Sequence, residues 1–199
     1  MLRAVFLLSL ALLGACALSP QSGDAVANYD FGLPRSDRDA SPRLHRELVV
    51  AAVAAPAWMD NSDIHYRLAY QDAARPQAYS RSRWVMPPAA LLGQRLRASI
   101  ARANTAAVFV PADGMPADYT LRMELEEFSQ VFDQADQSRA VVRLHASLIR
   151  NRGVVAQQSF GIDKAAMKPN AEGGVRSLIA ASDEAGELLI DWLAANMEK

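Results

Sequence analysis

The chain has 199 residues, of which 51% are hydrophobic and 22% charged, and its formal net charge is −1. This composition excludes disordered, collagen-like and disulfide-rich chains, which need fewer apolar residues or far more Gly or Cys. The length suits one globular domain with an extension. The near-neutral charge does not indicate nucleic-acid binding, and the single cysteine, Cys16, cannot form an internal disulfide.

The first 16 residues have the pattern of a secretory signal. Arg3 supplies a positive charge, and a short apolar run from 4 to 13 follows it. This run is too short for a membrane span, which needs about 20 apolar residues. Its end, Leu13-Gly14-Ala15-Cys16, resembles the bacterial lipobox, which a lipoprotein signal peptidase cleaves before the cysteine. We therefore expect cleavage between Ala15 and Cys16 to remove residues 1–15.

Cys16 is the predicted lipidation site, where acyl chains such as palmitate would anchor the mature protein. Two or more chains hold a protein on a membrane stably, because each buried CH₂ contributes about 0.8 kcal/mol. The alternatives are an ordinary signal peptide with a chance cysteine, or a free buried thiol. The residue directly after Cys16 is Ala17 and not Asp. By resemblance to the enterobacterial sorting pattern, this predicts the periplasmic face of the outer membrane.

Residues 16–46 are predicted to be a lipidated tether, because they are rich in Ser, Pro, Asp, Arg and Gly and lack helical or strand periodicity. Within the tether, the stretch Tyr-Asp-Phe-Gly-Leu-Pro at 29–34 is an aromatic and apolar island. We expect this segment to dock on the folded domain, which takes residues 47–199.

The first half of the domain predicts strands followed by a helix. Residues 48–55 form a near-continuous apolar run, typical of a strand buried on both faces. Residues 64–70 alternate apolar and polar side chains, and 79–85 is a shorter extended piece. Pro87 and Pro88 then open an amphipathic helix that ends at Asn104, before a short strand at 107–110.

The second half predicts an antiparallel meander and a final helix. Residues 119–128 alternate with a change of phase at Glu126-Glu127, which predicts a β-bulge. A polar loop at 133–138, a strand at 140–148, a turn at 151–153 and a strand at 154–163 follow, and 175–193 carries one apolar helical stripe. The order of elements predicts an α+β fold, a two-layer sandwich of a mainly antiparallel sheet with two helices packed on one face.

No motif for catalysis, metal binding or nucleotide binding is present in the sequence. His45, His65 and His145 have no partners at metal-ligand spacing, and HExxH, GxSxG, Walker and Rossmann patterns are missing. We therefore predict no enzyme activity, no metal and no cofactor other than the covalent lipid on Cys16. The run Glu124–Glu127 and the set Arg95, Arg97 and Arg102 are interpreted as solvent-facing polar surfaces.

Five aromatic residues fall between positions 58 and 84. Amphipathic aromatic side chains are favoured where a surface is both apolar and wet, so this set is a candidate groove for a partner chain or an acyl group. The alternative is that the five side chains complete the core beneath the first helix. The set consists of Trp58, Tyr66, Tyr70, Tyr79 and Trp84.

Several short motifs follow one another in a recognisable order. After the lipobox and the 29–34 segment come Ala57-Trp58-Met59-Asp60, Ile64-His65-Tyr66-Arg67-Leu68, Tyr79-Ser80-Arg81-Ser82-Arg83-Trp84 and Pro87-Pro88. In this order and spacing the mature chain resembles the ABC-type transport auxiliary lipoproteins, and among them the PqiC-like components of MCE-type systems. The resemblance implies a non-catalytic periplasmic lipoprotein. Its implied partners are an ATPase, a permease and an MCE-domain substrate-binding protein that together move lipids or other hydrophobic molecules between two membranes.

Two other functions remain open from the residues alone. One is an envelope assembly lipoprotein unrelated to MCE transport. The other is an envelope hydrolase that uses Asp30 or the Glu124–Glu127 run, although paired catalytic acids normally need different environments and these look alike. The exposed edge of the predicted meander also makes a homo-oligomer possible.

Overall fold

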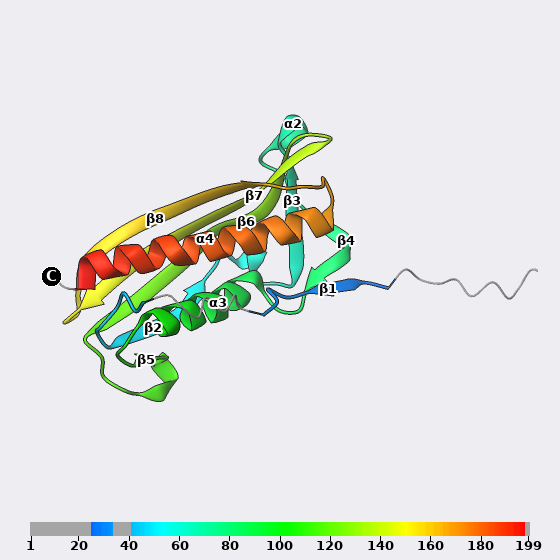
Figure 1. Cartoon of the computed structure of the whole chain (residues 1–199). Coiled ribbons are helices and arrows are strands. Elements are labelled where there is room, and N and C mark those ends of the chain that lie inside the picture. The colour runs from blue at the N-terminus through cyan, green and yellow to red at the C-terminus, as the bar shows by residue number, and fades with distance from the viewer. Residues whose placement is uncertain (1–24, 34–40, 198–199) are drawn as a thin grey trace, which may run out of the picture.

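The structure, a computed structural model, describes residues 25–33 and 41–197. In this part of the chain, strands form one curled sheet and helices pack against it (Figure 1). The strands are β1 (Ala27–Tyr29), β2 (Leu48–Ala54), β3 (Asp63–Leu68), β4 (Pro76–Trp84), β5 (Val108–Phe109), β6 (Tyr119–Gln134), β7 (Gln137–Arg150) and β8 (Gly153–Ala165). The helices are α2 (Ala69–Asp72), α3 (Pro88–Ala103) and α4 (Ala171–Met197), with 3-10 turns η1 (Ala57–Met59) and η2 (Pro111–Asp113).

The sheet forks along β6, which is its central strand. One edge of β6 pairs with β7 in antiparallel fashion. The other edge of β6 pairs with two strands in succession. β2 pairs with the first part of β6 and β3 pairs with the last part, both in parallel. The β3 branch continues to β4 and β1, the β2 branch continues to β5, and β8 lies beyond β7.

The long strands follow the predicted alternation. The register of β6 against β7 shifts between Leu125 and Glu127, which confirms the predicted bulge. The β6–β7–β8 meander is also confirmed. Asn151 and Arg152 both have positive φ, of 51° and 66°, as a tight hairpin turn with the right-handed strand twist requires.

The sheet is mixed, because it has parallel pairings that the sequence did not predict beside the long antiparallel meander. Four strand pairings are parallel and three are antiparallel. Two of the parallel pairings arise because the chain continues from β2 through η1 into β3 without reversing its direction along β6. A third helix, α2, begins at Ala69, where the predicted strand 64–70 would have continued.

The burial of β2 also differs from the prediction of a strand covered on both faces. Leu48 and Val50 are buried, whereas Ala52 and Ala54 are exposed. The stretch 48–55 is apolar partly because it contains several alanines, and exposing these small side chains to water costs little free energy.

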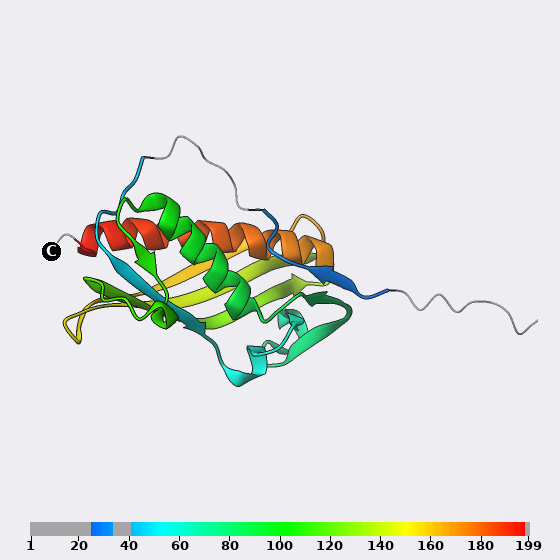
Figure 2. The same cartoon turned by 90° about the horizontal axis from the view of Figure 1, so that it is seen from below.

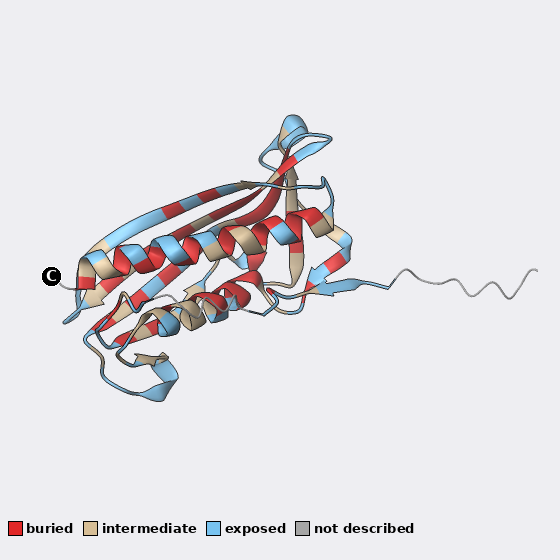
Figure 3. Ribbon diagram, viewed as in Figure 1, coloured by how far each residue is buried: buried red, intermediate tan, exposed pale blue. Residues whose placement is uncertain are grey.

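Helices α3 and α4 lie side by side on one face of the sheet (Figures 1 and 2). α4 packs on β7 and β8, α3 packs on β2, and the two helices contact each other. The buried side of α4 appears as a stripe along its length (Figure 3). None of the helices in the described ranges combines the length and the apolar character needed to cross a bilayer.

Candidate functional site

The predicted cleavage and lipidation residues, Ala15 and Cys16, lie outside the described residues. The described chain closest to them in sequence is the segment 25–33. How this segment is attached to the domain determines where a lipid anchor on Cys16 would hold the domain.

Strand β1 attaches the segment to the edge of the sheet. It pairs in parallel with β4, with Ala27 opposite Ser82 and Tyr29 opposite Trp84. The amide of Val85 also donates a hydrogen bond to the carbonyl oxygen of Tyr29, at 2.9 Å. Backbone pairing of this kind fixes both the position and the direction of the chain as it enters the domain.

Phe31 inserts from this segment into the core. Its side chain is 6% exposed, and its ring lies 5.6 Å from that of Trp84 and 6.0 Å from that of Phe128. The Asp30 carboxylate accepts a hydrogen bond from the amide of Gly32 at 2.8 Å. Gly32 has a φ of 63°, in the left-handed region that glycine adopts without strain. The turn at Asp30 and Gly32 therefore places Phe31 between two core aromatic residues.

Arg95 of α3 connects the same turn to α4. Its side chain is 7% exposed, and its Nε and Nη2 donate hydrogen bonds to the two carboxylate oxygens of Asp183 at 2.8 and 3.1 Å. Its Nη1 donates to the carbonyl oxygen of Gly32 at 3.4 Å. The sequence interpretation of Arg95 as a solvent-facing residue is therefore wrong. The available signal was its helical spacing, because Arg95 falls within the apolar stripe of Leu92 and Leu96.

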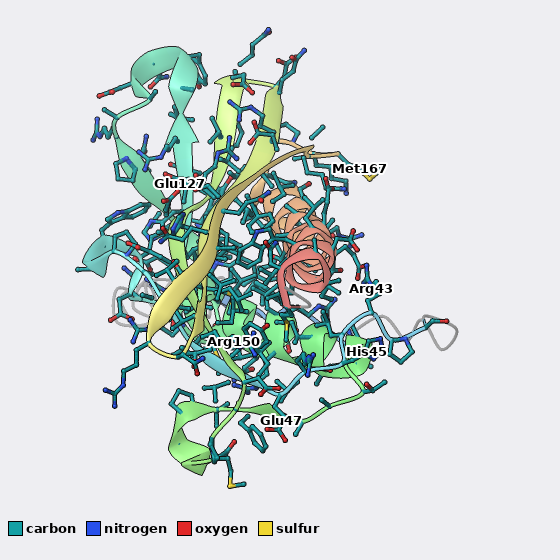
Figure 4. The ribbon with its side chains drawn as sticks, turned by 90° about the vertical axis from the view of Figure 1, so that its left-hand side faces the viewer. Arg43, His45, Glu47, Glu127, Arg150 and Met167 are labelled. Atoms are coloured by element: carbon teal, nitrogen blue, oxygen red, sulfur yellow. The ribbon has the colours of Figure 1, made fainter. Side chains whose placement is uncertain are left out.

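A second attachment follows at residues 43 and 44. The amides of Arg43 and Leu44 donate hydrogen bonds to the carbonyl oxygen of Ala103, at 2.8 and 2.9 Å, and Leu44 is 2% exposed. The guanidinium of Arg43 reaches α4, where it pairs with Glu187 and Asp191 at 2.7 and 2.6 Å (Figure 4). The predicted tether region thus contributes two core residues, Phe31 and Leu44.

The structure brings two of the five predicted groove residues together. The rings of Tyr66 and Tyr79 lie 4.6 Å apart, and both side chains are half-buried. The hydroxyl of Tyr79 donates to Oε1 of Gln130 at 2.8 Å, and burial raises the pKa of Tyr79 well above its usual range. Gln130 in turn donates to Ser138 at 2.7 Å, so the tyrosine pair belongs to a buried polar network.

The other three members lie apart from the tyrosine pair. Trp84 is 2% exposed in the core, and Tyr70 is 46% exposed on α2. Trp58 packs against His65, with ring centroids 5.1 Å apart. Because His65 and Tyr66 are consecutive in β3, their side chains point to opposite faces of the sheet. The partner or acyl groove stays a prediction, with Trp58, Tyr66 and Tyr79 as its half-buried members.

The acids considered for hydrolysis are either exposed to solvent or held in other contacts. Glu127 pairs with Arg67 at 2.9 Å, whereas Glu124 and Glu126 are exposed and Asp30 forms the turn beside Phe31. Within the described ranges, no group of three or more His, Cys, Asp or Glu side chains is placed to hold a metal ion. The attachment of segment 25–33 is thus the arrangement with the clearest functional meaning.

Residues 29–192 match the family model of the ABC-type transport auxiliary lipoprotein component. The chain belongs to this family. The match begins at Tyr29, so it includes the docked Phe31 segment of this auxiliary lipoprotein. The family consists of auxiliary lipoprotein components of ABC-type transport systems.

Two solved structures share the fold of the auxiliary lipoprotein. The crystal structure of protein XCC0632 from Xanthomonas campestris superposes with a TM-score of 0.70 at 17% identity, over 87% of this chain and 94% of that one. A crystal structure of an uncharacterized protein gives a TM-score of 0.66 at 14% identity, over 85% of this chain and 99% of that one. A comparison with curated proteins found no match.

Proposed function

We propose that the auxiliary lipoprotein is anchored by lipid on Cys16 to the periplasmic face of the outer membrane. There it docks an ABC-type transport system whose substrate-binding protein carries an MCE domain. The system would move lipids or other hydrophobic molecules between the two membranes. Family membership supports the transport role, and the attachment of β1 and Phe31 to the domain carries the docking role.

The docking role follows from the length of chain available. Cys16 precedes Ala25 by nine residues, which span at most about 30 Å at about 3.3–3.6 Å per residue. Because β1 and Phe31 are fixed to the domain, the domain cannot move farther from an anchor on Cys16 than this length allows. A short connection raises the effective concentration of the domain near the membrane, where it would meet a partner rooted in the opposite membrane.

Affinity capture tests the partner assignment. The full chain with a C-terminal tag is expressed in its own host and purified from detergent-solubilised envelopes. We expect an ATPase, a permease and an MCE-domain protein to co-purify, in larger amount than with the Cys16→Ser variant. Recovery of none of these subunits would contradict the proposal, and recovery of outer-membrane assembly proteins in their place would favour the alternative function.

The anchor is tested by the mass of the mature amino terminus. We expect the membrane-bound protein to begin at Cys16, with the added mass of a diacylglyceryl group and an amide-linked acyl chain. Cys16→Ser should move the protein out of the membrane fraction, whereas the neighbouring Ser19→Ala should leave it there. An unmodified Cys16 in the membrane-bound protein would refute the anchor.

A further inference from the structure

The loop between β8 and α4 presents an apolar side chain to solvent. Met167 is 97% exposed, more than any other large hydrophobic residue in the described ranges. Its side chain lies at the margin of the molecule (Figure 4). It lines an open cavity of about 300 Å³, together with Lys164, Lys168 and Arg176.

Hydrogen bonds fix this loop in place. The Asn170 side chain accepts from the amide of Gly173 at 2.9 Å, and its carbonyl oxygen accepts from the amide of Gly174 at 2.9 Å. The hydroxyl of Ser177 donates to the carbonyl oxygen of Ala165 at 3.2 Å. These bonds fix the chain where the loop meets β8 and α4, on either side of Met167.

The side chains around Met167 carry a small excess of positive charge. Lys164, Lys168 and Arg176 line the cavity together with one acid, Glu172, and Lys164 also pairs with Glu184 at 2.7 Å. Glu172 pairs with Arg176 at 2.6 Å and lies 3.9 Å from Lys168. An apolar side chain flanked by cations is the composition that binds the interface of an anionic membrane.

The loop lies at the end of the domain where the chain leads back towards Cys16. Figures 1 and 2 both place β1, the start of α4 and the β8–α4 loop at one end, and the loop between η2 and β6 at the other. α4 has 27 residues and is about 40 Å long at about 1.5 Å per residue. This length exceeds the reach of about 30 Å from Cys16 to Ala25, so an anchor on Cys16 excludes the orientation in which the Met167 end points straight away from the membrane.

We infer that the Met167 loop is a membrane-contact surface. Met167 enters the interface of an anionic phospholipid bilayer, while Lys168 and Arg176 meet lipid phosphates. This inference rests on the proposed function, because it requires the anchor on Cys16. Each cation at an anionic surface favours the bound orientation by about fivefold, so the contact orients a domain that is already anchored.

In-cell photo-crosslinking of the full chain tests this surface. Benzoyl-phenylalanine is placed at position 167 or, as the matched control, at Met115, which is 53% exposed in the loop between η2 and β6. We expect mass spectrometry to detect phospholipid adducts at 167, in at least fivefold larger yield than at 115. Protein adducts at 167, no adducts there, or equal lipid yields at both positions would overturn the inference.

Charge-reversal variants in the same crosslinking experiment provide a second test of the membrane contact. Lys168→Glu combined with Arg176→Glu should lower the lipid adduct yield at 167 by at least about 25-fold, because each lost cation accounts for about fivefold, with the melting temperature showing that the fold persists. Arg122→Glu with Arg152→Glu, in the cavity at the opposite end, should leave the yield unchanged, and a loss with both pairs would contradict a specific contact. A protein absent from the membrane fraction would overturn the anchor as well, whereas a membrane-bound protein without adducts at 167 overturns this inference alone.

Discussion

Arg95 and Asp183 form a bidentate ion pair between α3 and α4, with N–O distances of 2.8 and 3.1 Å. The remaining nitrogen of Arg95 donates to the carbonyl oxygen of Gly32. One guanidinium therefore joins both long helices to the segment that leads towards the predicted anchor. The planar, five-donor guanidinium suits this arrangement, which the ammonium of a lysine would not reproduce.

Arg95→Ala should lower the free energy of unfolding. The change leaves Asp183 and the Gly32 carbonyl without a partner, and loss of one member of a buried pair costs about 3–5 kcal/mol. Because the Asp183 side chain is 24% exposed, we expect a smaller loss of about 2 kcal/mol. Urea denaturation measures it, with exposed Arg102→Ala on the same helix as the control. Equal losses in the two variants would show that the pair does not contribute.

Phe31→Ala should destabilise the protein and loosen the docked segment. Removing a buried phenylalanine costs about 3–5 kcal/mol, because a cavity remains among its neighbours. Leu33, two residues on, is 93% exposed, so Leu33→Ala should change stability by less than about 0.5 kcal/mol. Urea denaturation and limited proteolysis near residue 30 compare the two variants. Wild-type stability and protease resistance in Phe31→Ala would refute the docking of this segment.

Gly173→Ala should disturb the start of α4. An added Cβ would lie 2.1 Å from the carbonyl oxygen of Lys168, and backbone cannot give way as a side chain does. We expect a loss of about 1–3 kcal/mol, as for other overpacked positions. Gly186→Ala is the control, because its Cβ would meet only a methyl group of Leu96 at 3.3 Å. A Gly173→Ala variant as stable as Gly186→Ala would contradict the close approach of the loop.

Stability should fall as the pH drops below about 6.5. Burial beneath Trp58 lowers the pKa of His65, only partly offset by the nearby Asp63 carboxylate. The unfolded chain therefore takes up the proton first, so protonation favours unfolding between the unfolded and the folded pKa. Thermal melts over this range should show a smaller pH dependence in His65→Gln than in the unsubstituted protein. Full pH dependence in His65→Gln would exclude His65 as its source.

Patterns within short stretches of the sequence predicted individual strands, the bulge and the start of a helix. The alternation in 119–128 and the change of phase at Glu126-Glu127 mark β6 and its bulge, because side chains alternate between faces with a period of two. Pro87 and Pro88 mark the start of α3. The ordered motifs around Trp58 and Trp84 led to the family that the comparison identified.

Contacts between distant residues could not be predicted in this way. Nothing in the local pattern of 48–70 shows that β2 and β3 share one edge of β6, since that depends on η1 carrying the chain forward. The partner of Arg95 lies 88 positions away, at Asp183. The five aromatic residues appeared as one set in the sequence, but Trp58 packs against His65, which the alternation of β3 places on the opposite face from Tyr66.

The distribution of the MCE-domain subunit between separated inner and outer membranes tests the docking claim most directly. Envelopes from cells with the native chain, with Cys16→Ser and with no chain are fractionated by density, and the subunit is quantified in each fraction. We predict that the native chain retains part of the MCE subunit in the outer-membrane fraction, and that Cys16→Ser lowers this part to the level without the chain. The same distribution in all three strains would contradict the account.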